Sequence, residues 1–251
     1  MFNTYEDIFS QRASSYHQAM AMYPLARKEE FELAVEYLDI LPNSTICDVP
    51  SGGGYLRKYV STASCFFHFL ETSENFASAT PKADNVKTQL CKFEVLPLPS
   101  QCADRLIMLA ALHHIQNRHQ VFKEFQRVLK PNGKILIADV EAGTNTGNFL
   151  NTFVNKFNSM GHEGDFITPK LFPLFDESAL KVISVNRPML HWNFDNECSM
   201  VTFCRNLFGL DKATDEDILS GIHRYLEPVF DHGKVSIRWQ LVYVLLQLKD
   251  A

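Results

Sequence analysis

Residues 44–141 alternate short apolar strands with amphipathic helical segments, and this alternation restricts the fold more than any other feature of the sequence. Four segments are apolar on both faces, as buried strands are: STICDV, ASCFFHFLE, ADRLIMLAAL and GKILIADV. Helical patterns follow the first two, and the second of these patterns has Ser73 as its expected N-cap. QNRHQVFKEFQRVLK separates the last two strands and is expected to end in a turn at Pro131–Gly133. With a weaker strand near residues 86–91, the order is β-α-β-α-β-loop-β-α-β. This order predicts a parallel sheet covered by helices.

The segments before and after residues 44–141 are predicted to complete the sheet and to cover one edge of it. A chain of 251 residues, 46% of them hydrophobic, can bury one core of this size, so we expect a single domain. Residues 1–43 carry two helical patterns and form an N-terminal cap. Residues 142–251 contribute the rest of the sheet and inserted helices that roof a pocket. We expect helices near 146–160, 197–208 and 215–226, and strands at 180–185 and 235–248. Thr214 and Asp217 resemble a capping box, which supports the helix at 215–226.

The stretch CDVPSGGGYL, at residues 47–56, lies where the first strand gives way to a helix. Gly52–Gly54 can take positive φ and let a ligand approach the main chain, because no Cβ intervenes. Pro50 fixes its own φ and holds Val49 extended. Ligands of open parallel sheets bind at the carboxyl ends of the strands, usually beside the first. The stretch therefore predicts a ligand-binding loop.

The spacing of the glycines argues against a pyrophosphate-binding turn. The dinucleotide fingerprint is G-x-G-x-x-G, but Tyr55 and Leu56 follow Gly54, so that only Gly52 and Gly54 fit. An acid does stand where a ribose partner belongs, because Glu71 ends the second strand. These features predict a nucleotide-like ligand. A nicotinamide-dependent oxidoreductase remains an alternative.

At this point the sequence resembles the class I S-adenosylmethionine-dependent methyltransferases, most closely the ubiquinone/menaquinone-biosynthesis type that acts on small molecules. The first motif of that family, acid-x-Gly-x-Gly-x-Gly, is matched by DVPSGGG at 48–54, with Pro50 in place of the first glycine. Its second strand ends in an acid followed by Ser or Thr, as in ETS at 71–73. LIMLAALHHI and RVLKPNGKILIAD match its later motifs. The resemblance covers about residues 44–141 and implies a Rossmann-like, mostly parallel seven-stranded sheet with helices on both faces.

The resemblance also implies roles for individual residues in a cofactor-binding core at 44–141. Gly52 and Gly54 would pass against the methionine part of S-adenosylmethionine, Asp48 would orient its amino group, and Glu71 would accept both ribose hydroxyls. The family often has an acid before a Leu-Pro loop, and counting back from Leu96-Pro97 puts Lys92 at that position. The adenine is therefore expected to meet main chain around Cys91 and Phe93. The residues implied in cofactor binding are Asp48, Pro50, Gly52, Gly54, Glu71, Thr72, Lys92, Phe93 and Leu109. The departures at Pro50 and Lys92 leave a non-catalytic cofactor-binding protein as a further alternative.

Methyl transfer from a sulfonium needs aligned partners, and it needs a base only if the acceptor arrives protonated. His113, just past the strand at 103–112, is the best-placed candidate. In some relatives of this fold a histidine there pairs with a tyrosine of an N-terminal helix, which would be Tyr16 or Tyr5. The alternatives are that His113 caps the next helix and that Tyr16 is a core or lid residue. His162 and His191 are candidates for the acceptor pocket, whereas His114 is expected to be structural.

Charge and motif content narrow the class of acceptor. The net charge is −5 and the basic residues are dispersed, so we expect no nucleic-acid partner. The end of the strand at 103–112 reads LAALHH rather than the [D/N/S]-P-P-[Y/F/W] string of nucleobase amine methyltransferases. We therefore expect a small-molecule acceptor. Neither the six cysteines nor a run of carboxylates shows metal-ligand spacing, so the sequence predicts no metal site.

The longest apolar runs are too short to cross a bilayer, and the acidic N-terminal segment does not resemble a signal peptide. We expect a cytoplasmic protein without a membrane partner, either a monomer or a homodimer.

Overall fold

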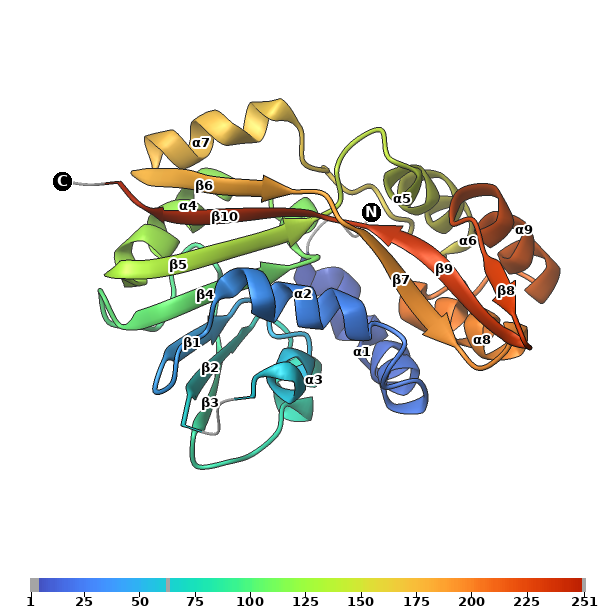
Figure 1. Cartoon of the computed structure of the whole chain (residues 1–251), viewed down its shortest axis with the longest axis horizontal. Helices are drawn as coiled ribbons and strands as arrows, with labels where there is room; N and C mark the ends of the chain where they lie inside the picture. The colour runs from blue at the N-terminus through green and yellow to red at the C-terminus, as the bar shows by residue number, and fades with distance from the viewer. Residues whose placement is uncertain (1–4, 62–63, 250–251) are drawn as a thin grey trace.

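The computed structural model describes residues 5–61 and 64–249, with side chains from Arg12 onward, and its main element is a seven-stranded sheet (Figure 1). The strand order is β3-β2-β1-β4-β5-β10-β6, in which β10 is antiparallel to both neighbours and every other pair is parallel. This confirms the predicted Rossmann-like, mostly parallel sheet. Its strands are β1 (Thr45–Asp48), β2 (Phe66–Glu71), β3 (Val86–Leu90), β4 (Ala103–Leu109), β5 (Leu129–Asp139), β6 (Leu180–Asn186) and β10 (Val242–Leu248).

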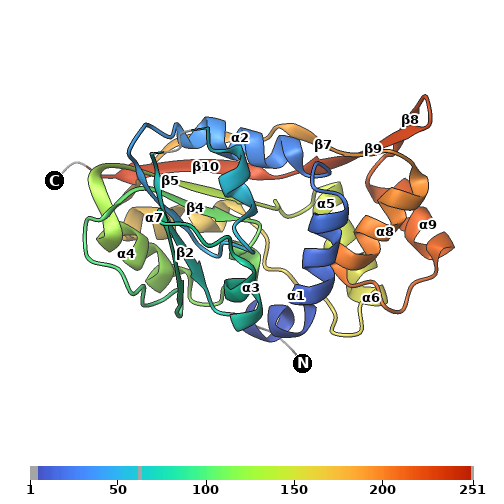
Figure 2. The ribbon, with the colours of Figure 1, turned by 90° about the horizontal axis from the view of Figure 1, so that it is seen from below.

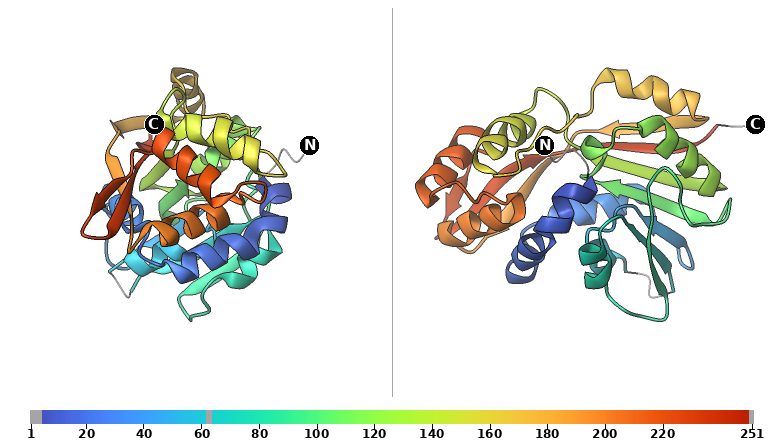
Figure 3. Two further views of the ribbon diagram at one scale, coloured as in Figure 1. Left: turned by 90° about the vertical axis from the view of Figure 1, so that its right-hand side faces the viewer. Right: turned by 180° about the vertical axis from the view of Figure 1, so that it is seen from behind.

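Helices cover both faces of this sheet (Figures 2 and 3). Successive side chains of a strand point to opposite faces, so Ile135 and Ile137 of β5 pack in one apolar cluster and Leu136 and Ala138 in the other. The first cluster lies against α4 (Arg118–Val128), η4 (Pro169–Leu171) and α7 (Phe172–Glu177). The second lies against α2 (Lys28–Leu38). Apolarity on both faces of the central strands is thus explained by two separate cores.

The links between the strands differ in detail from the predicted ones. The segment after the glycines is a short 3-10 helix, η1 (Tyr55–Tyr59), and α3 (Glu74–Ala79) follows β2. Ser73 occupies the N-cap position of α3 as predicted, but its side chain makes no capping hydrogen bond. Residues Pro131 to Gly133 fall within the bounds of β5, where the pairing with β4 shifts register. The predicted turn is therefore an irregularity at the start of the strand.

A second sheet, which the sequence did not predict, extends from one end of the first (Figure 1). It is antiparallel in the order β7-β9-β8, formed by β7 (Met189–Phe194), β8 (Val229–Asp231) and β9 (Lys234–Gln240). The single strand predicted at 235–248 is wrong, because β9 and β10 belong to different sheets and only Leu241 separates them. Residues 187–241, which leave β6 and return as β10, are called the lid segment below.

Helices complete the lid segment and join it to the N-terminal part of the chain. The helices predicted at 197–208 and 215–226 are confirmed as α8 (Glu197–Phe208) and α9 (Asp215–Tyr225), and Thr214 and Asp217 form the predicted capping box. A helical run formed by α5 (Asn145–Asn148), a π-helical turn (Phe149–Val154) and α6 (Asn155–Phe157) packs against α9. The first helix, α1 (Tyr5–Met22), lies along α8 (Figure 2). The lid segment is thereby held over the carboxyl edge of the large sheet.

Within the described residues, none of the helices combines the length and apolarity that a membrane crossing requires.

Candidate active site

The glycine loop after β1 requires its three glycines. Gly52, Gly53 and Gly54 all have positive φ, of 56°, 98° and 74°. A Cβ on Gly53 would lie 2.7 Å from Cε1 of His17, and one on Gly54 would lie 2.8 Å from Cε2 of Phe69. Around Gly52, in contrast, the nearest atom is the hydroxyl of Tyr16 at 3.7 Å. Gly53 and Gly54 therefore allow the loop to pack closely against neighbouring side chains, whereas the space beside Gly52 is open.

Gly54→Ala should destabilise the fold more than Gly143→Ala does. Gly143 also has positive φ (81°), but no atom lies within 4 Å of its added Cβ, so that variant measures backbone strain alone, about 1 kcal/mol. At Gly54 the Cβ also meets the Phe69 ring and Pro81. We expect Gly54→Ala to lose at least about 1 kcal/mol more free energy of unfolding in denaturant titrations. Equal losses of unfolding free energy in the two variants would show that Phe69 and Pro81 move aside at little cost.

Two acids lie at this loop, each with one unpartnered oxygen. Oε1 of Glu71 accepts hydrogen bonds from Oγ of Ser51, at 2.9 Å, and from the Gly52 N–H. Oε2 of Glu71 and Oδ2 of Asp48 are buried without a hydrogen-bond partner. Buried polar atoms rarely lack a hydrogen-bond partner, and these two oxygens are therefore candidates for ligand contacts. They fit a ligand that brings hydroxyl and ammonium donors to the loop.

Burial also changes the titration of both acids. It raises the pKa of Glu71 to about 7, although hydrogen bonds from Ser51 and Gly52 partly offset the effect. It raises the pKa of Asp48 well above its usual range, and the charge of Glu71 adds to this. A donor-bearing ligand would favour the ionised forms and so lower both pKa values.

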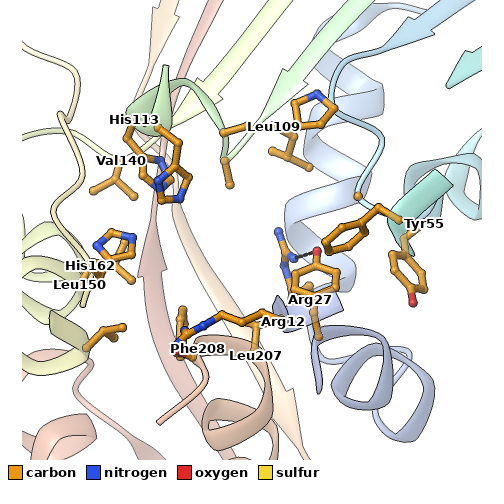
Figure 4. Close-up of a pocket in the computed structure, with 18 of the residues that line it drawn as sticks. Arg12, Arg27, Tyr55, Leu109, His113, Val140, Leu150, His162, Leu207 and Phe208 are labelled. Carbon is orange, nitrogen blue, oxygen red and sulfur yellow. Dashed lines mark hydrogen bonds between the residues drawn. The ribbon is translucent and has the colours of Figure 1, made fainter. Parts of the chain in front are cut away.

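A cavity extends from this loop to the lid segment. It is lined by the ends of β1 and β4, by α1 and α2, and by side chains of the lid segment (Figure 4). Among the predicted residues, Asp48, Pro50, Gly52 and Leu109 line it, as do the two catalytic candidates Tyr16 and His113. These predicted residues come from three separate parts of the chain, namely α1, the end of β1 with the loop that follows it, and the end of β4 with the turn that follows it.

The other predicted cofactor residues lie elsewhere. Gly54, Glu71 and Thr72 are not among the cavity's lining residues. Lys92 forms an isolated bridge with Val95, and Phe93 is buried in the apolar cluster under α4. Neither lines this cavity. The adenine contact inferred by counting back from the Leu96-Pro97 loop remains a prediction.

Tyr16 is held by a buried charged pair that sequence reasoning missed. Its hydroxyl accepts a hydrogen bond of 2.8 Å from Nη1 of Arg27, whose Nε donates to Oε2 of Glu30 at 2.9 Å. The same oxygen accepts from Nε1 of Trp192 in the lid segment, at 3.0 Å. Burial raises the pKa of Tyr16, and the charge of Arg27 opposes this. The phenol is therefore a fixed, neutral part of the cavity wall.

His113 faces the cavity with its ring orientation fixed. It lies in η2 (Leu112–His114), directly after β4, and is 7% exposed. Its Nδ1 is 2.6 Å from Oδ1 of Asp139, and its backbone N–H donates to Oδ2 at 3.1 Å. Although burial acts in the opposite direction, the charge of His113 and this hydrogen bond hold the pKa of Asp139 below its usual value. An ionised carboxylate only accepts, so Nδ1 carries the proton and Nε2 is the ring atom that exchanges protons.

The structure gives His113 and Tyr16 different partners from those predicted. The hydrogen bonds described above pair His113 with Asp139 and Tyr16 with Arg27. Figure 4 shows His113 and Arg27 on different sides of the cavity. The side chain of the alternative partner, Tyr5, lies outside those the structure describes. Asp139 could have been found from the sequence, since it ends the strand next to β4.

Two more histidines lie against His113. The ring centroid of His114 is 4.0 Å from that of His113, and the centroid of His162 is 5.4 Å from it. Burial, followed by the charge of His113, lowers the pKa of His162 to about 3 and that of His114 well below its usual value. Both rings are therefore neutral near pH 7. His162 lines the cavity, whereas His191 is outside it, with its Nδ1 3.5 Å from Oε2 of Glu29.

A second, more polar cavity opens on the other side of these rings. It shares His113, His114 and His162 with the first cavity, together with Asn158 and Gly161. Its remaining lining includes Glu163, Asp165 and Lys212. The three imidazoles thus stand at the junction of an apolar space near the glycine loop and a polar one.

Comparisons with known proteins agree with this arrangement. A family model described as "Methyltransferase domain" matches residues 47–137. The methyltransferase YcgJ of Bacillus subtilis is 26% identical over 164 residues, 62% of each chain. The ubiquinone/menaquinone biosynthesis C-methyltransferase UbiE of Bordetella parapertussis is 39% identical over 54 residues, 22% of this chain and 21% of its own. The chain thus spans less than two thirds of the length of these curated relatives.

Solved structures show the same fold. The structure of YcgJ has a TM-score of 0.65 at 15% identity and covers 88% of this chain and 98% of its own. A methyltransferase in complex with the Haloferax volcanii Trm112 methyltransferase activator also has a TM-score of 0.65 at 15% identity, covering 98% of both chains. The matched family segment contains the glycine loop, Glu71 and His113. Residues 47–137 thus match a methyltransferase domain of the class I, S-adenosylmethionine-dependent type, and the chain shows distant homology to YcgJ and UbiE.

Proposed function

We propose that this protein transfers the methyl group of S-adenosylmethionine to a small-molecule acceptor bound between the glycine loop and the lid segment. The observation that carries the proposal is one cavity that joins Asp48 and Gly52 to the His113–Asp139 pair. Family membership supports S-adenosylmethionine as the cofactor. The unpartnered oxygens of Asp48 and Glu71 suit its ammonium and ribose hydroxyl donors.

The cofactor supplies an electrophilic methyl group on sulfur, and the chain's own residues align the acceptor and exclude water. The acceptor atom forms a bond to the methyl carbon while the carbon–sulfur bond breaks and its electron pair stays on sulfur. A protonated acceptor gives its proton to Nε2 of His113, which Asp139 holds in position. Tyr16, fixed by Arg27, forms the opposite wall.

The lid side of the cavity supports an acceptor with an apolar body. It is lined by Leu150, Val154, Leu207 and Phe208, and by Trp192 and Trp239, whose ring centroids are 4.2 Å apart. Such surfaces bind flat or branched hydrocarbon with little cost, because few polar groups must lose water. The apolar body would lie under the lid segment and the reacting atom near His113.

Two measurements on the purified chain test the proposal. We expect saturable binding of S-adenosylhomocysteine in calorimetry, and transfer of label from methyl-labelled S-adenosylmethionine to a member of a panel of apolar hydroxyl, amine and carbon acceptors. Binding without transfer to any acceptor would favour the non-catalytic alternative. Saturable binding of NADH with no binding of S-adenosylhomocysteine would favour the oxidoreductase.

Cofactor affinity should rise with pH across neutrality. The pKa of Glu71 is about 7 in the free protein, and only its carboxylate form can accept both ribose hydroxyls. The carboxylate fraction increases about tenfold from pH 6 to pH 8, so the dissociation constant of S-adenosylhomocysteine should fall by up to about tenfold. Calorimetry at several pH values checks this. Glu71→Gln cannot titrate and should flatten the profile, and an unchanged profile in that variant would assign the pH dependence to another group.

A further inference from the structure

The three imidazoles at the junction of the two cavities offer nitrogen atoms to one common point. One ring nitrogen each of His113, His114 and His162 lies within 4.8 Å of the other two. His113 and His114 come from the turn after β4, and His162 comes from the loop after α6. Sequence spacing gives no sign of this set, because His162 reaches the pair only through the fold.

Two of the rings are each held through Nδ1 by a hydrogen bond. Nδ1 of His113 donates to the carboxylate of Asp139. Nδ1 of His162 is 3.0 Å from Oδ1 of Asn151, and Nδ2 of Asn151 donates to the Gly164 carbonyl at 2.8 Å, which fixes the orientation of the amide. Both rings therefore carry the proton on Nδ1 and present a lone pair on Nε2. Metal-binding histidines are held in this way by carboxylate or carbonyl partners.

We propose that His113, His114 and His162 form a binding site for a first-row divalent metal ion of the Zn²⁺ or Fe²⁺ type. Imidazole sets favour these ions over Mg²⁺ and Ca²⁺, which prefer oxygen. Nitrogens around a tetrahedral zinc lie about 3.3 Å apart, so small side-chain rotations must bring the rings together. The second cavity, through which an ion would reach the cluster, is lined by Glu163, Asp165 and Lys212.

The position of the site assigns the ion a task in the proposed methyl transfer, on which this part of the inference rests. Three protein ligands leave at least one coordination position open, and the cluster borders both cavities. A hydroxyl or enol oxygen of the acceptor would occupy that position and lose its proton to water in the second cavity. The oxygen then bonds to the methyl carbon as the carbon–sulfur bond breaks toward sulfur. In this state Nε2 of His113 is a ligand rather than the base.

The site is tested by binding, without cofactor or acceptor. Protein dialysed against a chelator is titrated with Co²⁺, whose visible absorption reports its ligands, and Zn²⁺ is then added as competitor. We expect one Co²⁺ per chain, displaced by Zn²⁺. His162→Ala should weaken Co²⁺ binding by more than 100-fold, and Asn151→Leu, which removes the outer partner, by about 10–100-fold. His191→Ala, a histidine outside both cavities, should bind as the parent does.

The results of these experiments test the metal site, its catalytic task and the proposed function separately. Binding of S-adenosylhomocysteine by His162→Ala shows that the variant is folded, and His114→Gln replaces it if it is not. Absence of stoichiometric Co²⁺ binding, or binding unchanged in the cluster variants, overturns the site and leaves a hydrogen-bonded histidine cluster. Full methyl transfer by chelator-treated enzyme overturns the ion's catalytic task but leaves the proposed function intact. Metal binding without transfer to any acceptor keeps the site and rejects that function.

Discussion

Replacing His113 by alanine is expected to lower the turnover number by about 10²–10⁴-fold while leaving the affinity for S-adenosylhomocysteine unchanged. The structure fixes His113 between the glycine loop and the second cavity, because its Nδ1 and its backbone N–H both contact Asp139. Removal of the imidazole takes away the proton acceptor, and the ligand if a metal is bound. Turnover is measured with labelled cofactor and affinity by calorimetry.

The exposed His223→Ala is the matched control, expected to retain parent activity. Asp139→Asn keeps the His113 ring but changes which nitrogen carries its proton. The amide of the new asparagine can donate to Nδ1 of His113, which moves the proton to Nε2. We expect this variant to lower turnover and change the pH profile. A fully active His113→Ala protein would return this histidine to the alternative role of capping the turn after β4.

Glu71→Ala is expected to weaken S-adenosylhomocysteine binding by about 1.5–3 kcal/mol, a loss of roughly 10–150-fold in affinity. Two effects combine in this variant. The unpartnered Oε2 is lost as an acceptor for ribose, and the loop loses the bonds from Ser51 and Gly52 to Oε1. Calorimetric titration measures the sum of the two.

Two further variants distinguish the loss of the ribose acceptor from the loss of the hydrogen bonds within the loop. Ser51→Ala removes one of the bonds to Oε1 but keeps the carboxylate, so it reports the contribution of the loop alone. Glu74→Ala removes an exposed acid three residues away and should bind as the parent does. Affinity in Glu71→Ala equal to that of the parent would remove this residue from the cofactor site.

The sequence was sufficient for the large sheet because the signals that specify it are local. Segments apolar on both faces became β1, β2, β4 and β5, since each lies between two apolar clusters. Capping residues also act within one turn of chain, and Thr214 with Asp217 marked the start of α9 correctly. The glycine loop was found for the same reason, because its conformation depends on residues that have no Cβ.

The second sheet was missed although a signal for it was present. In VSIRWQ, at 235–240, buried and more exposed side chains alternate, whereas VYVLLQL, at 242–248, is mostly apolar. The first pattern is typical of an antiparallel strand with one open face and the second of a core strand. The change between them at Leu241 marks the passage from one sheet to the other. MLHWNF, at 189–194, alternates in the same way.

The contacts within the site were less predictable because they depend on tertiary structure. Arg27 and Glu30 form an ordinary helical pair in the sequence, and only the lid segment brings Trp192 to them. His162 meets His113 through a loop whose course no local pattern specifies. Lys92 and Phe93 were placed by counting along a loop, where one inserted residue is enough to change which side chain faces a ligand.

The attachment of the lid segment has a consequence for how acceptor preference can change. Asn186 of β6 and Tyr243 of β10 are paired neighbours, so the segment leaves and re-enters the large sheet at adjacent positions. It is in effect a long insertion at the tip of a β-hairpin. Exchange of this one continuous segment between related proteins would replace Trp192, Phe208 and Trp239 of the cavity lining together. Under the proposed function, the glycine loop, Glu71 and the His113–Asp139 pair would be inherited unaltered, so a new acceptor site would need no change in the residues that hold the methyl donor.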